Sequence, residues 1–128
     1  MKTILTSRQI ECTKELLQLI YEYQKNPNTV ITITYGNLNG ITKMHISDQA
    51  VEKEVGEVSR LCHKLGLPMI SALVVNKATG ISGHGFYTFM AQLRGEDIEN
   101  VNKKELHKRE LDAIKKCENW HILEDYLS

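Results

Sequence analysis

The chain has 128 residues, of which 41% are hydrophobic and 25% charged, as in an ordinary globular domain. Its 16 basic and 16 acidic residues cancel, which argues against binding nucleic acid through bulk positive charge and leaves room for a local basic face. Three widely spaced cysteines have neither disulfide nor metal-ligand spacing, which excludes those two kinds of site on sequence grounds.

The length suits one domain, spanning residues 1–128, with a single core. The first residues lack the apolar run of a signal peptide, and no stretch has the length of a membrane span. We therefore expect a cytoplasmic domain that holds no cofactor or metal and does not enter membranes.

The first half of the chain predicts three helices and one short strand. Residues 7–24 predict a helix, because Thr6 and Gln9 have capping-box spacing before a one-sided apolar stripe. The alternating, β-branched segment Thr29–Ile33 predicts a strand. Two further helices are predicted over residues 35–39, capped by Thr34, and from Ser47 or Asp48 to about Leu65.

The second half begins at Pro68, which confirms the helix stop at Gly66. An apolar run then predicts a buried strand, and the glycines after it predict a turn. The expected elements are a strand over Met69–Val75, a turn over Asn76–Gly80, an extended or looped piece over Ile81–Tyr87, a helical turn or two over Phe86–Leu93, a helix over Lys103–Asn119, and an apolar tail from Trp120 that packs back on the core.

Four short motifs occur in an order that resembles the DNA-binding domain of the O6-alkylguanine DNA alkyltransferases and the alkyltransferase-like proteins. They cover roughly residues 30–90 and are Thr34-Tyr35-Gly36, Lys53-Glu54-Val55-Gly56, Pro68-Met69-Ile70-Ser71 followed by Leu73-Val74-Val75, and Gly80-Ile81-Ser82-Gly83-His84-Gly85-Phe86-Tyr87. The resemblance implies a winged helix in which the helix from Asp48 is the recognition helix. Lys53 then lies where the family has an inserted arginine.

The chain departs from this family at the reactive position. Met69 stands where the family has its cysteine, and Ile70 and Ser71 replace the histidine and arginine that follow. A thioether has no ionisable thiolate and cannot act as the nucleophile. We therefore expect no alkyl transfer and no enzymatic activity.

A second resemblance, to small domains found alone or attached to restriction-type nucleases of the HNH class, covers more of the chain. It is carried by Tyr35-Gly36, the run Pro68 to Val75, Asn76-Lys77-Ala78-Thr79-Gly80, Gly83-His84-Gly85-Phe86 and Trp120. This resemblance implies a binding module linked to restriction or to defence against phage.

Together these features predict an α+β fold: a small winged-helix-like domain with an N-terminal and a C-terminal helix around a short antiparallel sheet. The predicted function is non-enzymatic DNA binding through a helix face and a glycine-rich wing. The candidate nucleic-acid-binding residues are Tyr35, Lys53, Arg60, Lys64, Lys77, Gly83, His84 and Gly85.

Each element of this hypothesis has an alternative. The helix face also carries Asp48, Glu52, Glu54 and Glu57, which is equally typical of a solvated surface or of a module that binds a protein partner and occludes a nucleic-acid-binding enzyme. The glycines could bring backbone amides to a phosphate or only make a turn, and with His84 they could bind a small nucleotide. The sequence leaves the oligomeric state open.

Overall fold

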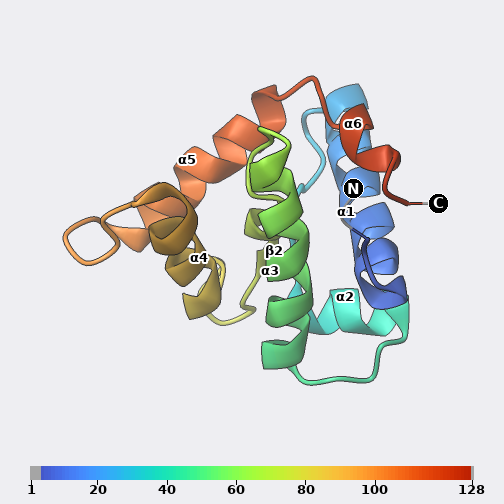
Figure 1. Cartoon of the computed structure of the whole chain (residues 1–128), viewed down its shortest axis with the longest axis horizontal. Helices are drawn as coiled ribbons and strands as arrows, with labels where there is room; N and C mark the ends of the chain where they lie inside the picture. Colours follow the sequence, from blue (N-terminus) through green and yellow to red (C-terminus); the bar gives the residue numbers. More distant parts are fainter. Residues whose placement is uncertain (1–3, 128) are drawn as a thin grey trace.

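Six α-helices, one 3-10 helix and two short strands make up residues 4–127, the part of the chain that the structure, a computed structural model, describes. They are α1 (Ser7–Lys25), β1 (Ile33–Thr34), α2 (Tyr35–Thr42), α3 (Asp48–Lys64), η1 (Ile70–Leu73), β2 (Val74–Val75), α4 (His84–Arg94), α5 (Lys103–Lys116) and α6 (His121–Glu124). In Figure 1, α3 runs through the middle, with α1 and α6 on one side of it and α4 and α5 on the other.

The two longest helices begin where their capping residues predict. Thr6 Oγ1 accepts a hydrogen bond from the Gln9 amide at 3.2 Å, and Gln9 Oε1 accepts one from the Thr6 amide at 3.1 Å, which completes the capping box of α1. Ser47 Oγ accepts from the Ala50 amide at 3.1 Å and starts α3. The predicted bounds of both helices are confirmed to within a residue or two.

The predicted α+β winged-helix class with an antiparallel sheet is wrong, because the fold is mainly helical and its one small sheet is parallel. Ile33 lies opposite Val74 and Thr34 opposite Val75. Parallel strands need a crossover connection rather than a tight turn, and α2, α3 and η1 supply it here.

The buried run before β2 forms η1 rather than a long strand. The Ala72 amide donates to the Met69 carbonyl at 3.1 Å, and every residue of η1 is buried. A fully buried apolar run has no polar side to fix its period, so the sequence pattern fits a strand and a short helix equally well. Only Val74 and Val75 of the predicted strand Met69–Val75 are extended and paired.

The core is one cluster of mainly aliphatic side chains around α3, closed at one end by the C-terminal segment. Trp120 is 1% exposed, and its indole Nε1–H donates to the Ile114 carbonyl at 3.1 Å. Leu123 of α6 is fully buried in the same cluster. The predicted packing of the tail against the core is therefore confirmed.

Candidate nucleic-acid interface

A short turn holds α2 across the first end of α3 rather than along it (Figure 1). Lys43 ends α2 in the left-handed region, with φ 56° and ψ 36°. The Asn39 side chain then clamps the turn, because its Nδ2–H donates to the Ile46 carbonyl at 2.7 Å and its Oδ1 accepts from the Ile46 amide at 3.3 Å. α2, the turn over residues 43–47 and the longer α3 follow the order of a helix-turn-helix, with a turn of five residues where the motif usually has three or four.

Three of the predicted cations lie on one solvent-facing stripe of α3. Lys53, Arg60 and Lys64 are seven and four residues apart, which corresponds to about two turns and one turn of the helix. Lys53 and Lys64 are exposed, and the Arg60 side chain is 42% exposed. We call these three residues the α3 stripe. At about 1.5 Å per residue it extends over roughly 16 Å.

The carboxylates of α3 are mostly directed to other partners. Glu52 accepts a hydrogen bond from the Gly85 amide at the start of α4. Glu54 faces α1, where its charge adds to the effect of burial and raises the pKa of Cys12 to about 11. Glu57 pairs with Arg60 within the stripe, at 3.4 Å between Oε2 and Nε. Within residues 4–127, Glu57 is the one α3 carboxylate that forms an ion pair with a residue of the stripe.

The predicted wing is a helix start. Asn76 to Gly80 form the expected turn, closed by the Gly80 amide donating to the Asn76 carbonyl at 2.8 Å, and Gly80 needs its positive φ of 73°. The chain then enters α4 at His84 instead of returning as a strand. The prediction of an extended or looped Ile81–Tyr87 is therefore wrong for the residues from His84 onward.

The Glu52 carboxylate lies so close to Gly83 and Gly85 that neither position has room for a side chain. A Cβ on Gly83 would come within 2.5 Å of Glu52 Oε2, and a Cβ on Gly85 would collide with the same carboxylate. The Gly83 amide donates to the Tyr35 hydroxyl at 2.9 Å. Both amides thus have partners inside the chain, and His84 between them is exposed. Sequence reasoning missed Glu52, which no local pattern connects with a segment more than thirty residues away.

Tyr35 is buried, at 4% exposure, and its role in the structure is to receive the Gly83 amide. Burial raises the pKa of its hydroxyl to about 12. Lys77 lies in the exposed turn after β2, where it lines an open cleft of about 670 Å³ with Tyr35, Asp48 and the first turn of α2. The eight candidate residues therefore fall into the α3 stripe, the start of α4 and this cleft.

One residue that sequence reasoning did not single out stands beside the stripe. The guanidinium Cζ of Arg60 lies 5.0 Å from the centroid of the Phe89 ring. Phe89 of α4 reaches α3 because residue 56 is a glycine, on which a Cβ would lie 2.8 Å from Phe89 Cε2. The pairing of Gly56 with an aromatic residue on another helix has no sequence signature.

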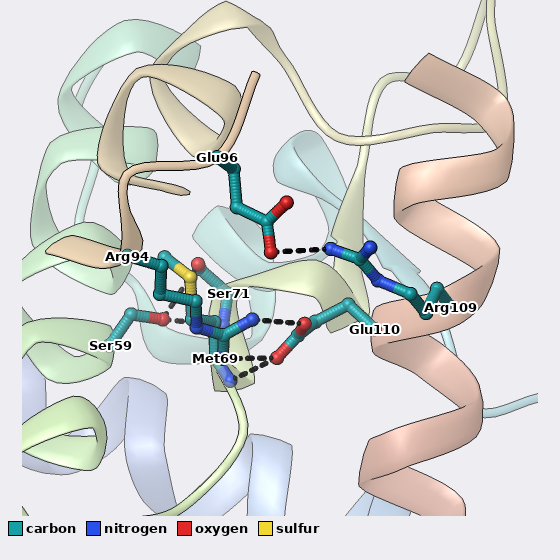
Figure 2. A network of polar contacts seen from close by, with 7 residues as sticks. All are labelled: Ser59, Met69, Ser71, Arg94, Glu96, Arg109 and Glu110. Atoms are coloured by element: carbon teal, nitrogen blue, oxygen red, sulfur yellow. Dashed lines mark hydrogen bonds and ion pairs between the residues drawn. The ribbon is translucent and has the colours of Figure 1, made fainter. Parts of the chain in front are cut away.

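Met69, which stands where the resembled alkyltransferases have a cysteine, belongs to a network of polar contacts (Figure 2). Met69 is fully buried, and its amide donates to Glu110 Oε2 at 2.7 Å. Arg94 Nη1 and Nη2 donate to the two oxygens of Glu110 at 2.6 and 2.7 Å. A pair from Arg109 to Glu96, at 2.7 Å, lies beside this network. These contacts tie α4, α5 and the segment before η1 together.

No protein-family model, curated protein sequence or solved structure matches the chain. Among residues 4–127, no helix combines the length and the apolar character needed to cross a membrane. The same residues contain no cluster of three His, Cys, Asp or Glu side chains suited to a metal ion.

Proposed function

We propose that the chain binds duplex DNA, with α3 as the helix that enters the major groove. The observation that carries the proposal is the α3 stripe, in which three cations share the outer face of the second helix of a helix-turn-helix arrangement. The second helix of such a unit is the one that lies in the groove.

The dimensions support this role. The major groove is about 12 Å wide, so a stripe of roughly 16 Å can reach a phosphate at each of its ends. Lys53 and Lys64 are at those ends and both are exposed. Two α3 carboxylates, Glu52 and Glu54, face α4 and α1 rather than the stripe, so that Glu57, paired with Arg60, is the acid that lies among its cations.

The start of α4 takes no part in this proposal. Its Gly83 and Gly85 amides already donate to Tyr35 and Glu52, so a phosphate would have to displace a carboxylate of the same chain. This differs from the wing contact expected from the sequence, and it restricts the proposed surface to α3 and the residues beside it.

The test is a salt titration of duplex binding, followed by fluorescence anisotropy. The two phosphate contacts of Lys53 and Lys64 give a slope of log K against log salt of about −1.8, and Lys53→Ala should reduce its magnitude by about 1. Lys25→Ala is the matched control, since Lys25 is an exposed lysine on α1, and it should leave the slope unchanged. Absence of binding by the wild type at low salt overturns the proposal.

A further inference from the structure

Arg60 differs from the two lysines of the stripe in how firmly it is held. Its Nε lies 3.4 Å from Glu57 Oε2, and its Cζ lies 5.0 Å from the centroid of the Phe89 ring. Within residues 4–127, its two terminal Nη groups donate no hydrogen bond. The ion pair is at the inner nitrogen Nε, the Phe89 ring lies against the guanidinium group, and the two outer Nη groups stay available to a ligand.

The platform under Arg60 is built by the packing of α4 on α3. Phe89 is half-buried and packs against the core, so its ring cannot swing away freely. Gly56, one turn before Arg60, allows the ring to lie against α3. An arginine that is already ordered loses less side-chain entropy when it forms a directed pair of hydrogen bonds.

The lysines and the arginine of the stripe therefore suit different ligands. A lysine ammonium is a flexible point charge suited to phosphates, whereas the planar arginine fork matches two acceptors at once. In the major groove, guanine presents O6 and N7 as such a pair of acceptors, and arginine bound to both is the commonest base-specific contact. Arg60 lies between Lys53 and Lys64 on α3. If the two lysines contact phosphates of the two DNA strands, Arg60 faces the edges of the bases between them.

We propose that Arg60, ordered by Phe89 and Glu57, is the specificity-determining residue of α3 and that it recognises a guanine in the major groove. This inference rests on the proposed binding of duplex DNA. It assigns base recognition to one side chain of the stripe and leaves Lys53 and Lys64 to contact the backbone.

The experiment begins with selection of bound duplexes from a library with a randomised centre, using the whole chain. The selected duplex is then compared with the same duplex carrying 7-deazaguanine at the preferred guanine, which removes the N7 acceptor and keeps base pairing. The wild type should bind the modified duplex roughly ten times more weakly, within the range for one bidentate contact. Arg60→Lys should bind both duplexes within about a factor of two.

Two further variants separate recognition from general attraction. Lys53→Ala should weaken binding to both duplexes equally and keep the tenfold ratio, because a phosphate contact carries no base information. Phe89→Leu should reduce the ratio, and Glu57→Gln, which lies on the surface and leaves the core intact, should reduce it as well. Thermal unfolding of each variant verifies that it is folded.

The possible failures are distinguishable. If the wild type binds no duplex at low salt, the proposed function falls and this inference falls with it. If it binds duplexes without preference for guanine, or if Arg60→Lys keeps the ratio, only the assignment of Arg60 is overturned, and Arg60 is then a phosphate contact. If the ratio survives in both Phe89→Leu and Glu57→Gln, the ordering of Arg60 by these neighbours is overturned.

Discussion

Replacing Glu110 by glutamine should destabilise the fold more than any other removal of a single charge among the described ion pairs. Glu110 is 2% exposed and accepts hydrogen bonds from both Nη groups of Arg94 and from the Met69 amide. Removing one partner of a buried ion pair costs roughly 3–5 kcal/mol, since the other charge stays buried without compensation. Because the Arg94 side chain is 24% exposed, we expect about 2–3 kcal/mol.

The loss is measured by urea unfolding at neutral pH, and it should also lower the melting temperature by roughly 10 °C. Glu96→Gln is the matched control, because the Arg109–Glu96 pair has the same 2.7 Å distance but an Arg109 side chain that is 54% exposed. The control should cost less than about 1 kcal/mol.

Combining Glu110→Gln with Arg94→Met tests the origin of the effect. The double variant should recover part of the loss, because no unpaired charge is left, while the Met69 amide still lacks its full acceptor. Equal costs for Glu110→Gln and Glu96→Gln would refute the reasoning, since the Glu110 pair is buried and has three hydrogen bonds whereas the Glu96 pair is more exposed and has one.

Two other features give stability predictions. Gly85→Ala should lower the free energy of unfolding by about 1 kcal/mol, because the new methyl group displaces the Glu52 carboxylate. In a Glu52→Ala background the same substitution should be neutral or stabilising, because alanine favours a helix. A cost that persists in that background contradicts the account. His107 is buried, and its Nε2–H donates to the Ala72 carbonyl. Burial lowers the pKa of His107, so the unfolded chain takes up the proton at a higher pH than the folded chain does. The free energy of unfolding should therefore fall as the pH drops below about 6.5. Urea midpoints measured from neutral to mildly acidic pH check this, and His107→Gln should flatten the dependence; an unchanged slope in that variant would rule out His107 as its cause.

Local rules were enough for the helices with strong caps and clear periodicity. The capping box of Thr6 and Gln9 located α1, and the steps between Val51, Val55 and Val58 identified the buried side of α3. In both cases residues close in sequence favour the helix, and tertiary packing favours the same helix. The cationic side of α3 follows from the same periodicity.

The predicted extended or looped conformation of the glycine segment is wrong from His84 onward, because the residues that stabilise the helix there are distant in sequence. Two glycines around His84 disfavour a helix locally, so a loop was the reasonable expectation. The structure forms α4 there because Glu52 accepts the Gly85 amide and Tyr35 accepts the Gly83 amide. A contact between residue 52 and residue 85 depends on how α3 and α4 pack, and a single sequence contains no record of it.

The parallel sheet and the Arg60 platform were missed for a related reason. A buried apolar run before Val74 does not reveal whether its neighbour runs parallel or antiparallel, since that depends on the connection. Phe89 reads as one more core aromatic until the structure brings it to Gly56. The residue types at the site were therefore predictable, whereas their partners on other elements were not.

The most direct test of the account is the affinity of the wild-type chain for a labelled duplex of about two helical turns, measured at increasing salt concentration beside Lys53→Ala. The account predicts binding at low salt, a slope of about −1.8 for the wild type, and a slope smaller in magnitude by about 1 for the variant. Binding that is absent at low salt, or a slope that Lys53→Ala leaves unchanged, would contradict the assignment of α3 as the DNA-binding helix.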